Sequence, residues 1–190
     1  MVLLKDREVE YVDNSLRYVD CKSMIMHSWE DDLMRRKAEF VCEQGGDILE
    51  LGFGMGISAN YIQHQKINSH TICEIHPKVI QELNIWKKDK NNVVVLEGDW
   101  YDNVVNMGKY DGILFDTHDD MHYMNFFTEV IPKIAKPNCR ITWWNNLPKE
   151  DNKRLKVKEN SKFEMIEVNP PEENTYFNHK QYYMPKYIHS

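Results

Sequence analysis

Short apolar segments alternate with longer amphipathic segments along the middle of the chain. The apolar segments are residues 47–51, 70–75, 92–96, 110–115 and 140–144. Between them lie segments with apolar side chains at helical spacing, at residues 57–65, 77–88, 100–107 and 120–135. Strands that alternate with helices in this way are typical of a parallel sheet with crossover helices. The pattern therefore predicts an α/β fold.

The two ends of the chain add further elements to this sheet. Residues 28–42 carry apolar side chains at helical spacing and stop before Gly45 and Gly46, which predicts an amphipathic helix with a glycine stop. Residues 163–168 and 181–188 are two further strand-like runs. With the five central runs they predict one domain, with a mostly parallel seven-stranded sheet, helices on both faces and an antiparallel C-terminal hairpin.

The composition limits the expected partners. The chain has 190 residues, with 24 Lys and Arg against 30 Asp and Glu, so its formal net charge is −6. We expect no nucleic-acid partner and no membrane partner, because a broad cationic surface and an apolar run of roughly 18 residues are both missing. The first residues become charged too early for a secretory signal, so a cytoplasmic location is expected. The four cysteines form no Cys-x-x-Cys pair, which argues against a zinc site or a disulfide framework.

A glycine-rich turn follows the first central strand. Gly52, Gly54 and Gly56 separate that strand from a helix, so a ligand can approach the backbone and the free N–H groups of the helix start. Glu74 ends the next strand, where its carboxylate can accept the hydroxyls of a ribose. This combination occurs in sites for nicotinamide dinucleotides and for S-adenosylmethionine, and it does not choose between them.

The third and fourth central strands also end in acids. Asp99 with Trp100 suits the amine and the flat face of adenine, although Asp99 could equally be a helix N-cap. Asp116 follows the fourth strand, beside the expected position of the reacting group. His118, Asp119 and Asp120 come next; no matching ligand group occurs elsewhere, so we interpret them as a loop and a helix cap and expect no metal.

At this level of detail the sequence resembles a known family. Over roughly residues 11–188 it is similar to class I S-adenosylmethionine-dependent methyltransferases, and among them to guanidinoacetate N-methyltransferases and the related arginine δ-N-methyltransferases. The resemblance rests on residues 26–34, 50–56, 73–77, 96–100 and 110–117. The Gly-Phe-Gly-Met turn and the Trp29-Glu30 pair are particular to this branch.

The resemblance implies a Rossmann-like fold, S-adenosylmethionine as cofactor and two sets of site residues. The implied cofactor contacts are Gly52, Phe53, Gly54, Met55, Gly56, Ile57, Glu74, Ile75, His76, Gly98, Asp99 and Trp100. The implied substrate contacts are Met26, Glu30, Met34, Asp116, Thr117, Asn146 and Leu147. Residues 1–44 then form a lid and a helix, 45–144 the cofactor-binding core, and 145–190 the substrate-side loop and closing hairpin.

The chemistry of a guanidinium suits two carboxylates. This flat cation has a pKa above about 12 and presents a fixed fork of donors, so acids approaching from two directions match it. Asp116 is the expected base, and Glu30 is expected to hold the donor groups of the guanidinium in line, with a share in accepting the proton as an alternative. On the residues alone, Glu30 could simply favour the start of a helix, and only the resemblance gives it a catalytic role.

The acceptor remains open at this stage. Residues 145–150 differ from the segment that receives the substrate carboxylate in guanidinoacetate methyltransferases, so another small guanidine is also compatible with the sequence. The alternatives are a protein arginine δ-N-methyltransferase, a non-catalytic S-adenosylmethionine-binding protein and a nicotinamide reductase. An N-terminal lid that includes Tyr11 and Tyr18 would have to exclude water from the reacting atoms.

Overall fold

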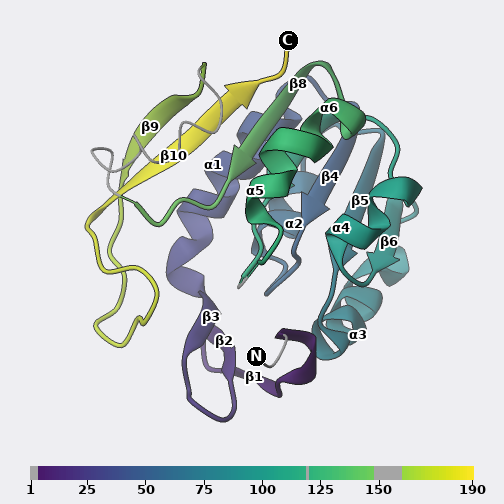
Figure 1. Cartoon of the computed structure of the whole chain (residues 1–190). Helices are drawn as coiled ribbons and strands as arrows, with labels where there is room; N and C mark the ends of the chain where they lie inside the picture. Colours follow the sequence, from purple (N-terminus) through teal and green to yellow (C-terminus); the bar gives the residue numbers. More distant parts are fainter. Residues whose placement is uncertain (1–3, 119, 148–159) are drawn as a thin grey trace.

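The protein is built around a seven-stranded sheet with the strand order β6-β5-β4-β7-β8-β10-β9, seen in a computed structural model that describes residues 4–118, 120–147 and 160–190 (Figure 1). The strands are β4 (Asp47–Leu51), β5 (Ser69–Glu74), β6 (Val93–Glu97), β7 (Tyr110–Phe115), β8 (Ala135–Trp143), β9 (Lys162–Glu167) and β10 (Gln181–Ile188). Neighbours from β6 to β8 are parallel, and β10 is antiparallel to both β8 and β9. The predicted fold class is confirmed.

Helices cover both faces of this sheet. They are α1 (Asp31–Cys42), α2 (Ile57–Gln63), α3 (Pro77–Trp86), α4 (Trp100–Asn103), α5 (Tyr123–Asn125) and α6 (Ile131–Ile134). Short 3-10 turns occupy Leu4–Asp6, Ser28–Glu30, Lys87–Asp89 and Val104–Asn106. In Figure 1, α1 and α2 lie behind the sheet, whereas α5 and α6 lie in front of it. Both faces of the central strands are therefore removed from water, which explains why those strands are continuously apolar.

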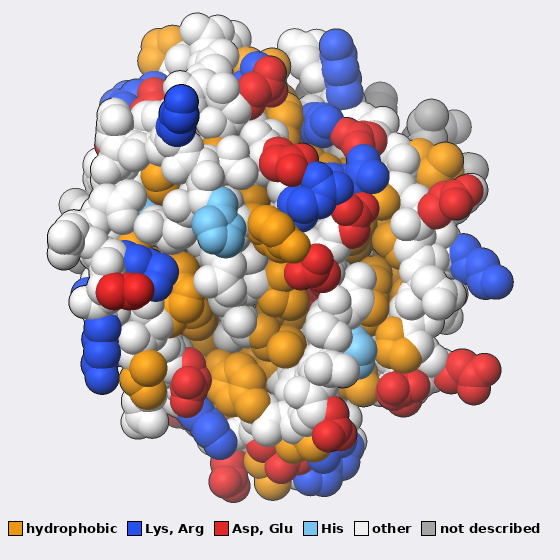
Figure 2. All heavy atoms as spheres, turned by 180° about the vertical axis from the view of Figure 1, so that it is seen from behind, with side chains coloured by type: hydrophobic (Ala, Val, Ile, Leu, Met, Phe, Trp, Pro, Cys, Tyr) orange, Lys and Arg blue, Asp and Glu red, His pale blue; other side chains and the backbone are white. Residues whose placement is uncertain are grey.

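Helix α1 has a charged side that faces outward and an apolar side that faces the sheet. Arg35 pairs with Asp32 and Glu39 on the outer side, and Arg36 pairs with Asp32 and Glu164. Figure 2 shows the rear face of the molecule, on which basic and acidic side chains lie next to one another. The inner side of α1 packs against the sheet. A polar side chain buried there is costly unless it has a partner.

The N-terminal lid is a small antiparallel sheet that the sequence analysis did not predict. Its strands are β1 (Val9–Val12), β2 (Ser15–Tyr18) and β3 (Met24–His27). The Tyr11 hydroxyl donates to the Gly54 carbonyl at 3.0 Å, and Lys78 Nζ donates to the Val9 carbonyl at 3.0 Å. These contacts hold the lid against the carboxyl ends of the central strands (Figure 1).

The predicted helix over residues 120–135 is interrupted. Helix α5 is followed by a π-helical segment, Phe126–Val130, and then by α6, which contains Pro132. Proline has no N–H and clashes with the carbonyl four residues earlier, so the chain widens and the Ile131 N–H bonds to the Phe126 carbonyl five residues back. Strand β8 consequently begins at Ala135 rather than at residue 140.

Within the described residues, none of the helices has the length and apolar character needed to cross a membrane.

Candidate active site

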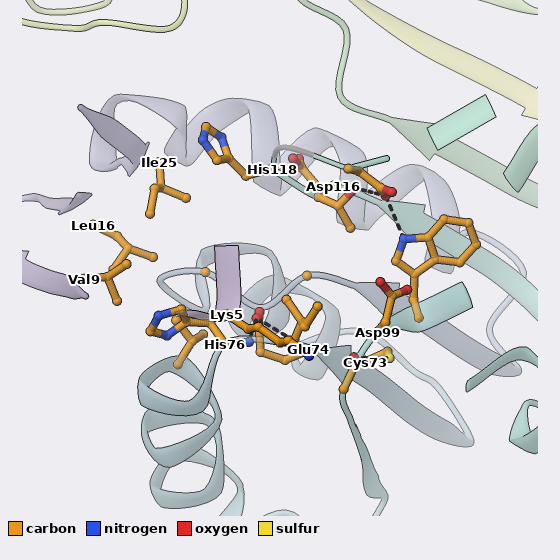
Figure 3. A pocket seen from close by; sticks show the side chains of 18 of the residues that line it. Lys5, Val9, Leu16, Ile25, Cys73, Glu74, His76, Asp99, Asp116 and His118 are labelled. Carbon is orange, nitrogen blue, oxygen red and sulfur yellow. Dashed lines mark hydrogen bonds between the residues drawn. The ribbon is translucent and has the colours of Figure 1, made fainter. Parts of the chain in front are cut away.

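The carboxyl ends of four neighbouring strands enclose a cavity of about 440 Å³. The strand-end residues that line it are Gly52, Glu74, Gly98, Asp99, Asp116 and Thr117. Figure 3 shows Val9, Leu16 and Ile25 of the lid on one side of this cavity and Asp99 on the other. The position matches the crevice at which α/β sheets bind their ligands.

The glycine turn is packed too tightly to accept side chains. A Cβ atom at Gly52, where φ is +92°, would lie 2.1 Å from the Asp116 carbonyl oxygen. A Cβ atom at Gly54 would lie 2.7 Å from Met26 Sδ. The missing side chains therefore let the turn pass between β7 and the lid while its backbone faces the cavity.

Glu74 connects the turn to the end of β5. One carboxylate oxygen accepts the Phe53 N–H at 2.8 Å, and the other accepts the Ile75 and His76 N–H groups at 2.8 Å. A carboxylate has about four acceptor positions, so about one remains for a ligand hydroxyl. The residue both shapes the turn and lines the larger cavity.

Asp99 and Trp100 begin the next helix. The Asp99 side chain accepts the Tyr101 N–H at 2.8 Å and thus caps α4, while it also lines the larger cavity. Trp100 is held by the Asp120 carboxylate, which accepts its indole N–H at 2.7 Å. The two interpretations of Asp99 are therefore compatible, and the contact with adenine remains a prediction.

A second cavity of about 190 Å³ adjoins the first, because Gly52, Gly54 and Asp116 line both. The expected substrate residues that line it are Met26, Glu30, Met34, Asp116, Thr117 and Asn146. The other lining residues include Ser58, His118, Trp144 and Tyr176. Glu30 and Asp116 thus border one common space, although 86 positions separate them in the chain.

Glu30 closes the 3-10 turn before α1 and is only 3% exposed. Its Oε1 atom accepts the His27 N–H at 3.2 Å and the hydroxyl of Tyr176. Burial, together with the nearby charge of Asp116, raises the pKa of Glu30 to about 8. The carboxyl group therefore exchanges its proton near neutral pH.

Asp116 forms an ion pair that the sequence analysis missed. Lys37 is fully buried, and its Nζ atom lies 2.7 Å from Asp116 Oδ2 and 4.8 Å from the centre of the Trp144 ring. Burial alone would lower the pKa of Lys37, but the charge and hydrogen bond of Asp116, together with Tyr182 and Glu30, raise that pKa above its usual value. The sequence did contain an indication that Lys37 lies near the site, because Glu30, Met34 and Lys37 fall on the same helical face.

An aromatic wall completes the second cavity. Tyr176 and Phe177 come from the connection between β9 and β10, and both rings stack on Trp29, with centroids 6.1 and 5.7 Å apart. Trp144 meets the Tyr176 ring edge-on at 5.9 Å. Tyr176 could not be found from its surroundings in the sequence, because it meets Glu30 across 146 positions.

Several predicted site residues lie outside these cavities. Phe53 lines the smaller cavity, whereas Met55, Gly56, Ile57 and Leu147 line neither. Gly56 packs against the ring of Phe53, where a Cβ atom would be 2.7 Å away. Of the segment 145–150, residues 148–150 lie outside the described residues. Within the described part of the chain, no group of three or more His, Cys, Asp or Glu side chains could hold a metal ion.

The fold is that of several solved enzymes. It is similar to precorrin-6y C5,15-methyltransferase from Geobacter metallireducens, with 13% identity and a TM-score of 0.62 over 82% of this chain and 86% of that one. It is also similar to spermidine synthase from Thermotoga maritima, with 12% identity and a TM-score of 0.68 over 98% and 74%. The order of the strands in the sheet, with glycines and acids at their carboxyl ends, defines a class I methyltransferase fold.

The chain belongs to the guanidinoacetate N-methyltransferase family, whose model matches residues 5–157. It is 35% identical over 153 residues to protein arginine N-methyltransferase 2 of Kluyveromyces lactis and 34% identical over 154 residues to that of Saccharomyces cerevisiae. Each match covers 74% of this chain but 37% of the relative, so the chain corresponds to only part of those proteins. The expected family is confirmed, and the relatives that the chain matches bear the names of N-methyltransferases.

Proposed function

We propose that this protein transfers a methyl group from S-adenosylmethionine to a nitrogen of a guanidino group. The observation that carries the proposal is the position of Glu30 and Asp116, which come from different elements and line one cavity beside the glycine turn. Two acids facing one space provide the acceptors that the fixed donor fork of a guanidinium requires.

The residues around the larger cavity fit S-adenosylmethionine. The backbone of the glycine turn would face its methionine part, Glu74 its ribose, and Asp99 with Trp100 its adenine. The lid residues Val9, Leu16 and Ile25 would cover it and limit the access of water. The bound molecule supplies a methyl group on a positively charged sulfur, which is a good leaving group.

The second cavity suits a flat cation. Its acids supply charge, and the rings of Trp144 and Tyr176 supply aromatic surface, which favours a guanidinium. Because Asp116 lines both cavities, an acceptor held by this residue lies next to the methyl donor. The protein's contribution is therefore alignment, charge matching and a place for the released proton.

For the acceptor we propose a small guanidine, such as guanidinoacetate, arginine or a related compound. A second candidate is an arginine side chain in a protein, favoured by the names of the relatives in two yeasts. The whole relatives are longer than this chain, so a partner protein could be bound by parts that have no counterpart here. The two candidates share the chemistry of the site and differ in the size of the acceptor.

The test is incubation with methyl-labelled S-adenosylmethionine and a panel of guanidinoacetate, free arginine, an arginine-containing peptide and the same peptide with lysine. We expect label on the guanidines and none on the lysine peptide. Glu30→Gln should lower turnover by at least about 100-fold, whereas Asp32→Asn, a matched change on the outer side of α1, should not.

Three other results would overturn the proposal. Label only on hydroxyls or carboxylates would contradict the acceptor chemistry. Binding of S-adenosylhomocysteine without turnover of any guanidine would support a non-catalytic binding protein. Binding of a reduced nicotinamide dinucleotide in its place would support the reductase alternative.

A further inference from the structure

We infer that Glu30, rather than Asp116, takes up the proton that the guanidino group loses. Buried Lys37 determines these two roles because it keeps Asp116 as an anion. The inference rests on the proposed function and assigns roles within the same site. The sequence alone favours Asp116 as the base, because nothing in it places a cation beside that residue.

The ion pair makes Asp116 a poor proton acceptor. Lys37 is fully buried and lies 2.7 Å from Asp116 Oδ2. Protonation of Asp116 would leave a buried ammonium without its counter-ion, and an uncompensated buried charge is strongly destabilising. Asp116 is therefore better suited to hold the guanidinium than to remove a proton from it.

Glu30 is in the opposite situation. Among the described residues, no cation forms an ion pair with it, and both of its hydrogen bonds end on Oε1, from the backbone of His27 and from Tyr176. Oε2 accepts no hydrogen bond from the described residues, and Glu30 lines the smaller cavity. Addition of a proton there relieves a buried, unpaired carboxylate, which is consistent with the pKa of about 8.

The charged and titratable groups around Glu30 come from several elements. They are Asp116 after β7, Lys37 on α1, Tyr176 between β9 and β10, His27 at the end of β3, and His118, which lines the smaller cavity; Tyr182 on β10 lies beside Lys37 and Asp116. With Glu30 ionised, the two carboxylates and the one ammonium leave a single negative charge. That charge matches one bound guanidinium.

The atoms and charges balance in this scheme. A nitrogen lone pair forms the new N–CH₃ bond as the S–CH₃ bond breaks, and the bonding pair stays on sulfur, which becomes a neutral thioether. One N–H proton moves from the same nitrogen to Glu30 Oε2. The methylated product leaves with the single positive charge with which the guanidinium arrived.

The first test counts protons without any methyl transfer. Binding of arginine or guanidinoacetate to the protein with S-adenosylhomocysteine is measured by calorimetry at pH 7, in two buffers of different ionisation enthalpy. A cation that displaces the proton of Glu30 should release about one proton from the wild type and none from Glu30→Gln. Asp32→Asn is the matched control and should behave as the wild type.

Variants of Lys37 separate a tuning role from a purely structural one. Lys37→Met leaves Asp116 unpaired and able to bind and release a proton itself, so Glu30→Gln should no longer abolish proton release in this background, whereas it should do so in a Lys37→Arg background. The double variant Lys37→Met with Asp116→Asn removes the pair without leaving a buried charge, and it should still release about one proton. Thermal unfolding of each variant checks that it is folded.

The second test is the pH profile of methyl transfer. Since Glu30 must be ionised to accept a proton, kcat/KM should rise with pH through about 8 in the wild type. This rise should persist in the double variant, at a lower rate because one substrate contact is lost, and disappear in Glu30→Gln.

The reverse pattern would overturn the inference: Glu30→Gln would keep the proton release and the pH profile, and the double variant would lose both. Failure of the proposed function looks different. In that case the wild type itself neither binds nor methylates any guanidine of the panel.

Discussion

At the scale of single residues, Glu30 is a carboxyl group whose ionisation works against folding. Its pKa is about 8 in the folded protein and 4.5 as a free side chain. Between these pH values the folded state binds a proton that the unfolded state has lost. Stability therefore falls as the pH rises from about 4.5 to about 8 and changes little from this cause above that range.

This argument predicts that Glu30→Gln stabilises the protein at alkaline pH. Its melting temperature should exceed that of the wild type at pH 9, by about 2 to 4 °C for each kcal/mol gained. The difference should be several-fold smaller at pH 5, where Glu30 is protonated in the folded state and close to its free pKa of 4.5 in the unfolded state. Differential scanning calorimetry at the two pH values measures it.

The outer acid Asp32 provides the control for this prediction. Its carboxylate is paired with Arg35 and Arg36, which lower its pKa, so Asp32→Asn should not stabilise the protein at pH 9. If Glu30→Gln were destabilised equally at both pH values, ionisation of Glu30 would not be what lowers the stability of the wild type.

Sequence reasoning reached the residues of this site unevenly. Gly52, Glu74, Asp99 and Asp116 stand at strand ends, where the pattern of apolar runs alone predicts their common location. Lys37 was missed because a lysine in an amphipathic helix is normally exposed. Its burial depends on Asp116, which comes from a distant strand.

At the scale of elements, the glycine turn links the larger cavity to the end of β7, which Asp116 follows. The backbone at Gly52 has a left-handed φ of +92°, and a Cβ atom there would overlap the carbonyl of Asp116, whose N–H is bonded to the Leu51 carbonyl. Neither partner can move without displacing the end of β7.

Gly52→Ala should therefore be strongly destabilising. We expect a loss of at least about 2 kcal/mol in the free energy of unfolding, from backbone strain and steric overlap together. Urea denaturation followed by circular dichroism measures this loss. Gly108→Ala is the matched control, since a Cβ atom at Gly108 meets nothing within 4 Å. Comparable losses in the two variants would contradict the account of the turn.

The lid is a second element whose role can be measured. Its Tyr11 hydroxyl donates to the Gly54 carbonyl, so it holds β1 against the glycine turn. Tyr11→Phe removes this bond, which is worth about 1 kcal/mol, and should weaken binding of S-adenosylhomocysteine about five-fold in a calorimetric titration.

Tyr183→Phe serves as its control, because Tyr183 is only partly buried and its hydroxyl bonds only to Gln181 among the described residues. If Tyr11→Phe bound S-adenosylhomocysteine as tightly as this control, the lid would have no part in holding the ligand.

Elements were predicted best where burial on both faces made the pattern strong. Strands β4, β5 and β7 lie inside the sheet and are apolar, whereas the edge strand β6 is apolar but partly exposed; the positions of all four agree with the prediction to within one residue. The lid strands β1 to β3 have four residues each and carry mixed polar and apolar side chains, so they give little periodic signal. Pro132 was the available warning that residues 120–135 would not form one regular helix.

At the scale of the whole molecule, segments from the N-terminal and C-terminal parts of the chain meet at the smaller cavity. The N-terminal turn brings Glu30, the sheet brings Asp116, and the connection from β9 to β10 brings Tyr176. No local pattern predicts such a meeting, because it depends on how the C-terminal hairpin closes the sheet. The order of the strands along the chain predicted the arrangement of the sheet, but it did not predict that Tyr176 lines the site.

The central claim is that Glu30 and Asp116 hold one guanidino group beside the methyl donor. A crystal structure of the protein with S-adenosylhomocysteine and a guanidine that is methylated in the panel tests it most directly. We predict one guanidino group within hydrogen-bonding distance of both carboxylates, with the sulfur in the adjoining larger cavity. A guanidino group bound elsewhere, or one that contacts neither carboxylate, would contradict the account.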